Sequence, residues 1–373
     1  MAGPLTGLRI IEMAGIGPGP FCGMMLADHG AEVIRIDRPG ARPEPVLGRN
    51  RKSVVCNVKT PEGIAVVKKL VEGADGFFEG LRPGVTERLG LGPDELIGLN
   101  PKLVYGRMTG WGQYGSYAQA AGHDINYIAL SGALHGYGRA GGKPTPPINM
   151  VGDFGGGGMM LAFGMVSALL HAQKTGEGQV IDCAMTDGSA VLTGMIWGMY
   201  GAGMWRDERG VNLLDTGAHF YDTYETKDGK HVSIGSIEPQ FYAELRRLAG
   251  LDDEAWDAQM DPKGWPDLKE KIAGVFKTKT RDEWDALMAE TDVCYAPVLS
   301  LSEAPVHPHN KERGTFVEVG GMVNPAPAPR YSKTKVPTPE APPATGSSTD
   351  DLLGELGYSA DEIAALREKK AVA

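Results

Sequence analysis

The sequence is poor in cysteine and in positive charge, and it has no long apolar run. Its four cysteines, Cys22, Cys56, Cys183 and Cys294, are scattered without a C-x-x-C pair, which argues against a zinc site and against a disulfide framework. The formal net charge of −10 argues against a general nucleic-acid binder, although a local basic pocket is compatible with it. No apolar run reaches the length of a membrane span, so we expect no membrane partner.

Targeting signals are also missing from the sequence. The first residues lack the basic and apolar regions of a signal peptide, and the last three residues are not Ser-Lys-Leu. Together with the reduced cysteines, this predicts a cytoplasmic protein. Hydrophobic residues make up 42% and charged residues 23% of the 373 positions, which is typical of a globular protein with more than one domain.

The N-terminal region predicts a βαβ unit. Residues 7–12 form an apolar strand, residues 14–20 a Gly/Pro-rich turn, residues 21–29 a helix ended by Gly30, and residues 31–37 a second strand. Gly15, Gly17 and Asp37 invite a dinucleotide-binding interpretation. However, Pro20 stands where that fingerprint needs Gly or Ala, and Pro18 removes a backbone donor. A tight strand-to-helix turn is therefore favoured.

Further strands and helices extend this unit into a doubly wound α/β domain. We expect helices from residues 61 and 93, and strands at residues 76–80, 103–108 and 180–184. Basic residues lie mostly just after strand ends, where such sheets bind ligands. They are either solvated surface charges or a site for a phosphate-bearing ligand: Arg35, Arg38, Arg49, Arg51, Lys52, Arg82 and Arg88.

A smaller α+β domain is expected after residue 218. Residues 220–226 and 230–236 alternate around Asp228-Gly229, which predicts a hairpin. Helices are predicted at residues 238–248, 265–276 and 281–290, a strand at 293–297, and a capped C-terminal helix after Ser359. We expect a large domain of residues 1–190 completed by 325–373, a linker helix at 191–217, and a small domain of 218–324.

The stretch from residue 122 to residue 158 carries the candidate chemistry. His123 can act as an acid or a base near neutral pH, and Asp153 precedes four glycines that are expected to start a helix. Two bases beside free backbone N–H groups would suit proton exchange next to a carbonyl. Asp153 could instead be a nucleophile in acyl transfer, and His123 could be structural. Eight of the 16 methionines lie between Met150 and Met204, either as ordinary core or as an adaptable apolar surface.

Six motifs make the chain resemble the α-methylacyl-CoA racemases of the family III CoA-transferase superfamily. They are residues 14–20, 79–90, 108–113, 122–127, 152–157 and 237–242. The resemblance implies an interlocked homodimer, with a Rossmann-like large domain and a smaller α+β domain. It implies interconversion of (2R)- and (2S)-2-methylacyl-CoA thioesters through an enolate. Asp153 would be one acid/base, and His123, paired with Glu238, the other.

The resemblance also implies contacts with the CoA part of the substrate. These would come from Arg38, Cys56, Asn57, Lys59, Gly80, Leu81, Arg82, Arg88, Gly122, Asp124, Ile125, Asn126 and Tyr127. No metal or other cofactor is expected, because the thioester already acidifies its α-carbon. Two alternatives remain: a CoA-transferase with Asp153 as the nucleophile of an acyl anhydride, and a non-catalytic CoA-binding protein.

Overall fold

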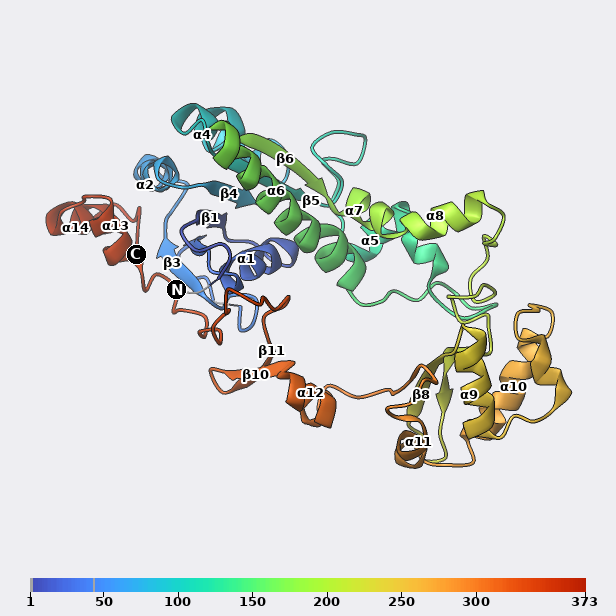
Figure 1. Ribbon diagram of the computed structural model, residues 1–373. Helices are drawn as coiled ribbons and strands as arrows, with labels where there is room; N and C mark the ends of the chain where they lie inside the picture. The colour runs from blue at the N-terminus through green and yellow to red at the C-terminus, as the bar shows by residue number, and fades with distance from the viewer. Residues whose placement is uncertain (1–2, 43) are drawn as a thin grey trace. The chain divides into compact units, whose positions relative to one another are not determined.

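Six parallel strands form the central sheet of the first of two structural units. The computed structural model describes residues 3–42 and 44–373, so residues 1, 2 and 43 of the predicted large domain lie outside the described part. The strand order is β3-β2-β1-β4-β5-β6, the doubly wound order of dinucleotide-binding folds (Figure 1). This confirms the predicted Rossmann-like α/β sheet. Its strands are β1 Arg9–Met13, β2 Glu32–Asp37, β3 Arg51–Val55, β4 Gly76–Glu79, β5 Val104–Thr109 and β6 Gln179–Ala184.

Helices cover both faces of this sheet and form two apolar cores. On one face, β-strand residues such as Ile11 and Phe77 pack with Val67 and Leu70 of α2 and with Leu353 of α13. On the other face, residues of α1 and α6 pack against the opposite side chains of the same strands. The helices of this unit are α1 Pro18–Asp28, α2 Pro61–Glu72, α3 Val85–Arg88, α4 Pro93–Leu99, α5 Asp124–Leu130, η2 Met150–Met159, α6 Met160–Thr175, α7 Met185–Leu192, α12 Pro308–Arg313, α13 Thr349–Glu355 and α14 Ala360–Glu368.

Two local predictions in this unit need correction. Helix α1 begins at Pro18, three residues before the predicted start, because proline suits the first helical position and Gly17 supplies the preceding turn with φ 66°. Strand β3 was missed because it opens with Arg51 and Lys52, which break the apolar pattern. Both side chains are paired with acids, as described below.

The four glycines after Asp153 do not precede a helix as predicted. They lie inside a continuous helix, Met150–Thr175, whose first ten residues, η2, have π-helical hydrogen bonding. Their small size serves close packing: a Cβ on Gly156 would meet the backbone N of Ser189 at 2.6 Å, and one on Gly158 would meet the Pro18 carbonyl oxygen at 2.8 Å. The glycines therefore let α7 and α1 approach this helix.

The same helix corrects the prediction that no apolar run reaches the length of a membrane span. Met150–Thr175 has a mean hydropathy of 1.4 in its most apolar window and is long enough to cross a membrane. Such length and composition also occur in core helices of globular proteins, and α6 packs Leu161, Met165 and Leu169 into the core against the sheet.

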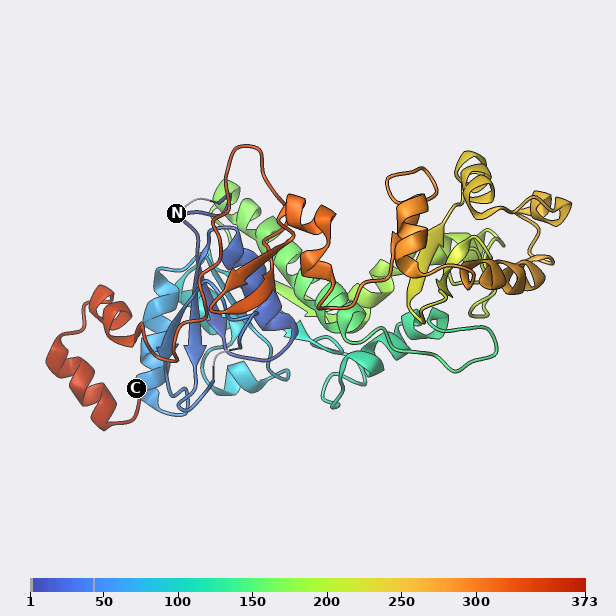
Figure 2. The same ribbon diagram turned by 90° about the horizontal axis from the view of Figure 1, so that it is seen from below.

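The C-terminal segment returns to the β3 edge of the first unit. The Val55 N–H donates to the Thr349 hydroxyl at 3.3 Å, and Cys56 pairs with Val372 in an isolated antiparallel bridge. Figure 2 shows α13 and α14 beside α2 and the C-terminus. The predicted cap of the last helix is present, since the Glu362 N–H donates to the Ser359 hydroxyl. A short hairpin, β10 Phe316–Val319 and β11 Met322–Pro325, belongs to the same segment.

The second unit is an α+β domain around a three-stranded antiparallel sheet, as predicted. The order is β7-β8-β9, and Gly229 has φ 72° in the turn between the first two strands. Phe220, Tyr242, Trp265, Phe276 and Trp284 dominate its core. Its elements are η1 Ala133–Gly136, α8 Gly194–Gly201, β7 Tyr221–Glu225, β8 His231–Gly235, α9 Pro239–Ala249, η3 Glu254–Ala258, α10 Trp265–Phe276, α11 Arg281–Met288, β9 Tyr295–Pro297 and η4 Ala304–Val306.

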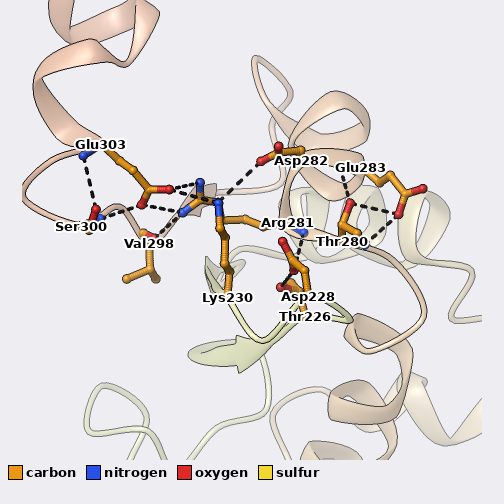
Figure 3. Close-up of polar contacts among 10 residues, drawn as sticks. All are labelled: Thr226, Asp228, Lys230, Thr280, Arg281, Asp282, Glu283, Val298, Ser300 and Glu303. Atoms are coloured by element: carbon orange, nitrogen blue, oxygen red, sulfur yellow. Dashed lines mark hydrogen bonds and ion pairs between the residues drawn. The ribbon is translucent and has the colours of Figure 1, made fainter.

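A charged network fastens the loop after β9 in this unit (Figure 3). The Arg281 guanidinium donates to both carboxylate oxygens of Glu303, at 3.0 and 2.7 Å, and to the Val298 carbonyl. Lys230, just before β8, also contacts Glu303. These donors hold the pKa of the Glu303 carboxyl below its usual range. The network has a structural role, because it holds the residues between β9 and η4 against Arg281 and Lys230.

The unit boundaries differ from the predicted ones. The first unit comprises Met1–Ser131, Ile148–Leu192 and Pro308–Ala373, and the second comprises Gly132–Pro147 and Thr193–His307. Residues 308–324 join the first unit, where buried Arg49 donates to Asn324 Oδ1 at 3.4 Å. Residues 132–147 join the second because Arg139 pairs with Asp222 and Arg209 donates to the Gly142 carbonyl. Residues 193–217 belong to the second unit and are not a separate linker.

Candidate active site

A cavity of about 1150 Å³ lies at the carboxyl ends of the strands of the first unit. Residues just after β1, β2, β4 and β5 line it, among them Ala14, Arg38, Gly80 and Gly110. In an open parallel sheet this edge is where ligands bind, and β1 and β4 mark the point where the strand order reverses. His123 and Asp153 both line this cavity, so the structure brings the two candidate proton-handling residues to one place.

Asp153 is held from two sides. Its backbone N–H donates to Asp124 Oδ1 at 2.7 Å, and Asn149 Nδ2 donates to Asp153 Oδ2 at 3.0 Å. Asn149 is the residue before the first turn of η2, one turn ahead of Asp153, so the helix itself sets this contact. The Asp153 side chain is thereby fixed at the edge of the cavity.

The Gly/Pro-rich turn after β1 packs directly against Asp153. Gly17 has φ 66°, which favours glycine, and a Cβ there would lie 3.3 Å from Asp153 Oδ2. Residues 14–20 all line the cavity. The turn thus provides room for the carboxylate, which agrees with the favoured tight-turn interpretation.

The surroundings of Asp153 shift its acidity. Burial raises the pKa of the Asp153 carboxyl, and the charge of Asp124 raises it further, while the Asn149 hydrogen bond and the nearby His123 oppose the rise. The pKa of Tyr127, which also lines the cavity, is raised by burial and by the charge of Asp153. A carboxyl whose pKa is raised toward neutrality is better suited to exchange protons with carbon than an ordinary aspartate.

His123 stands at the N-cap of α5 with an exposed side chain. Its backbone N–H donates to Asn126 Oδ1 at 3.0 Å, which fixes the start of the helix. Behind it, Tyr127 packs edge-on against Trp111 with ring centroids 4.8 Å apart. The imidazole therefore projects from an anchored helix end beside the cavity.

The predicted CoA-contact residues separate into two groups. Those that line the cavity are Arg38, Cys56, Lys59, Gly80, Leu81, Arg82, Gly122 and Tyr127. Those absent from its lining are Asn57, Arg88, Asp124, Ile125 and Asn126. Asn57 instead donates to the Lys370 carbonyl of the C-terminal segment, and Asp124 accepts the Asp153 N–H. A ligand in this cavity could therefore reach the first group directly, and the CoA contacts themselves stay a prediction.

Four of the basic residues considered for a phosphate site are paired with acids, although one of them, Arg35, also lines the cavity. Buried Arg51 pairs with Glu12 at 2.9 Å, buried Arg49 with Asp28 at 2.5 Å, and Arg35 with Asp37 at 3.0 Å. Lys52 pairs with Glu32. These residues stabilise the sheet and its edge, which favours a structural role over the alternative of a phosphate site.

The structure adds cavity residues that sequence reasoning missed. Arg42 joins Arg38, Lys59 and Arg82 as a cation of the lining, and Trp111, Asn149 and Met185 line it too. Arg42 lies in a loop without secondary structure and has no pattern that marks it. Asn149 could have been suspected from its place four residues before Asp153, one helical turn away.

The methionine-rich region contains both core methionines and exposed methionines, the two alternatives considered for it. Met165 and Met185 are buried in the core beside α6, while Met150, Met159 and Met195 are exposed.

Glu238 lies in the second unit, as the N-cap residue of α9, before Pro239 at the first helical position. Its pairing with His123 stays a prediction.

The site and fold can now be set beside known proteins. A family model described as CoA-transferase family III matches residues 5–349. The chain therefore belongs to CoA-transferase family III.

Relatives within this family include both isomerases and transferases by name. Alpha-methylacyl-CoA racemase of Mus musculus is 45% identical over 370 residues, covering 99% of this chain and 97% of that protein. The protein of the same name from Homo sapiens is 44% identical, with the same coverage. Succinyl-CoA:glutarate CoA-transferase of Homo sapiens is 29% identical, covering 95% of this chain and 86% of that protein.

Solved structures share the fold. A hypothetical protein from Mycobacterium tuberculosis superposes with a TM-score of 0.79 at 26% identity, covering 94% of this chain and 99% of that one. A CAIB/BAIF family protein from Brucella suis has a TM-score of 0.84 at 24% identity, covering 95% of this chain and 100% of that one.

Proposed function

We propose that this protein is an isomerase, an α-methylacyl-CoA racemase that interconverts (2R)- and (2S)-2-methylacyl-CoA thioesters. The observation that carries the proposal is the presence of His123 and Asp153 on one cavity, with the pKa of Asp153 raised. The 45% identity to a protein named as such a racemase, over nearly the whole chain, supports it. The enzyme would act in lipid and fatty-acid metabolism in the cytoplasm.

The proposed reaction needs two proton-handling groups on opposite faces of the α-carbon. One base removes the α-proton, and the C–H electron pair moves into the thioester carbonyl to form an enolate. The other group then gives its proton to the opposite face, and the carbonyl is restored. Asp153 serves one face and His123 the other, and the roles reverse for the other enantiomer. The chemistry needs no metal or redox cofactor, because one proton leaves the α-carbon and another replaces it without a change of oxidation state.

The cations of the cavity lining suit the CoA part of the substrate. The lining contains several cations although the net charge of the chain is −10, among them Arg38, Arg42, Lys59 and Arg82. Arginine and lysine recognise phosphate groups through charge-assisted hydrogen bonds. The nucleotide would lie toward these residues and the thioester toward Asp153.

A homodimer would complete the site. An apolar stripe on α6 is exposed in the single chain: Phe163 is 72% exposed, and Val166 and Leu170 lie one and two turns further on. Such a contiguous apolar face usually marks a protein interface. We infer that a second copy covers it in an interlocked dimer. In that dimer Glu238 would accept a hydrogen bond from the His123 imidazole and increase its basicity.

The second candidate is CoA transfer with Asp153 as the nucleophile. The family's description and the 29% identical human transferase favour considering it. In that reaction the Asp153 carboxylate attacks the thioester carbonyl and CoA thiolate leaves, forming an acyl anhydride. A transferase needs an acceptor carboxylic acid, whereas the racemase needs none.

The test is α-proton exchange in heavy water without an acceptor acid. The protein is incubated with one enantiomer of 2-methyldecanoyl-CoA, and deuterium at C2 is followed by NMR together with chirality. Deuterium entry with inversion is expected. Absence of exchange, combined with CoA transfer on adding dicarboxylic acids and with hydroxylamine trapping of an Asp153 adduct, would establish the transferase instead.

A further inference from the structure

Asp124 is a buried carboxylate between the two candidate bases. It follows His123 directly in the chain and occupies the first position of α5, yet its side chain is only 6% exposed and does not line the cavity. A buried carboxylate is costly unless its oxygens are hydrogen-bonded or paired with a cation. Its place in the fold therefore needs an explanation other than stability or contact with CoA.

The contacts of Asp124 point away from the cavity ligand and toward Asp153. Asp124 Oδ1 accepts the Asp153 N–H at 2.7 Å, and among the residues that the structure describes its Oδ2 has no hydrogen-bond partner. Gly152 is pressed against the same carboxylate, since a Cβ at that position would lie 2.4 Å from Asp124 Oδ1. Only glycine before Asp153 allows this approach of η2 to α5.

We propose that Asp124 is a positioning residue that fixes the spacing between the His123 and Asp153 side chains. The inference rests on the proposed function, in which these two side chains are the bases. One peptide unit separates Asp124 from His123, and one hydrogen bond joins it to Asp153. Asp124 therefore links the backbone of one base to the backbone of the other. Proton transfer on both faces of one carbon depends on such spacing, because reacting atoms must approach to about 3–3.5 Å.

Asn149 complements this contact on the Asp153 side chain. Asp124 fixes the backbone of Asp153, and Asn149 Nδ2 occupies its Oδ2 at 3.0 Å. Among the hydrogen bonds of the described residues none is donated to Asp153 Oδ1, which leaves this oxygen for the substrate proton. Asn149 orients the carboxylate, while Asp124 sets the position from which it acts.

Asp124 also acts on Asp153 through its charge. The ionisable groups that influence Asp153 are Asp124 and His123, with Tyr127 close enough to feel the Asp153 charge. The negative Asp124 raises the pKa of Asp153, whereas His123 lowers it. Replacing Asp124 by asparagine keeps an oxygen acceptor for the Asp153 N–H but removes this charge, which separates the geometric role from the electrostatic one.

The experiment compares Asp124→Ala and Asp124→Asn with the control Asp75→Ala in the full-length protein. Asp75 also accepts one backbone N–H, from Arg9 at 2.8 Å, but lies outside the cavity lining. The readouts are kcat and KM for each enantiomer of 2-methyldecanoyl-CoA, the pH profile of kcat, and the circular dichroism spectrum. We expect Asp124→Ala to lower kcat at least tenfold in both directions with KM changed less than threefold.

The pH profile of the asparagine variant separates the two possibilities, because it would not change if Asp124 were only structural. It should retain more activity than the alanine variant, and its acid limb should move to lower pH, because Asp153 stays deprotonated at lower pH without the neighbouring charge. The proposal is overturned if Asp124→Ala behaves like Asp75→Ala, or if KM rises while kcat is unchanged, which would make Asp124 a CoA contact. If the unmodified protein shows no α-proton exchange, the proposed function fails as well. Normal exchange with unaffected variants refutes the positioning role alone.

Discussion

The close approach of η2 and α7 makes Gly188→Ala a sharp test of how Asp153 is placed. A Cβ at Gly188 would lie 1.9 Å from the Gly156 carbonyl oxygen and 2.6 Å from its carbonyl carbon. Both are backbone atoms that cannot rotate away, so the two helices must separate by about 1.5 Å to restore ordinary contact. Overpacking of this kind costs about 1–3 kcal/mol, and we expect the upper end of that range in the free energy of unfolding.

The assay is urea unfolding followed by circular dichroism, alongside the α-proton exchange rate. Because η2 carries Asp153, Gly188→Ala should also lower kcat by tenfold or more. Gly98→Ala in α4 is the matched control: no atom lies within 4 Å of its added Cβ, and alanine suits a helix better than glycine by up to about 1 kcal/mol. Equal stability and equal exchange rates for the two variants would refute the role of the glycines in helix approach.

Three further predictions concern the sheet and the rim of the cavity. Burial raises the pKa of Glu79 to about 7, well above the usual value of a glutamate, so its protonated form stabilises the fold below about pH 4.5 and this stability is lost as the pH rises through 7. The free energy of unfolding of the unmodified protein, compared with that of Glu79→Gln, should therefore fall by up to about 3 kcal/mol between pH 4.5 and pH 8. A difference between the two proteins in urea unfolding that does not depend on pH would contradict this. Arg51→Leu leaves buried Glu12 without its cation and should lower the free energy of unfolding by about 3–5 kcal/mol. The double variant Glu12→Leu/Arg51→Leu should lose much less stability. Equal losses for the two variants in thermal unfolding would exclude the ion pair as the cause. Arg82→Ala should raise KM for the thioester about tenfold, equivalent to about 1.4 kcal/mol, with kcat unchanged, and an unchanged KM would remove Arg82 from the CoA site.

The sheet could be predicted from the sequence wherever strands are apolar and turns carry glycine or proline. The strand at Glu32–Asp37, the cap at Thr60 and the hairpin around Gly229 follow local rules, and all are present in the structure. Strand β3 could not be predicted in this way, because Arg51 and Lys52 are paired with acids far apart in the sequence. The same long-range pairing binds these basic residues to acids, which their positions in the sequence alone did not indicate.

The two proton-handling residues could be selected from the sequence, but their setting could not. The glycines after Asp153 were predicted to expose N–H groups at a helix start, whereas the structure uses them inside a helix for close packing. The partners of Asp153, namely Asn149 and Asp124, depend on how η2 packs against α5. Such tertiary contacts leave no periodic signal in a single sequence.

The most direct test of the two-base account is the enantiomer dependence of α-proton removal in His123→Ala and Asp153→Asn. Initial rates of deuterium entry at C2 are measured from (2R)- and from (2S)-2-methyldecanoyl-CoA in heavy water. The account predicts that each variant loses proton removal mainly from one enantiomer, that the two variants lose opposite enantiomers, and that CoA affinity is nearly intact in both. Loss from the same enantiomer in both variants, or loss of CoA binding with His123→Ala, would contradict the assignment of His123 and Asp153 to opposite faces of the substrate.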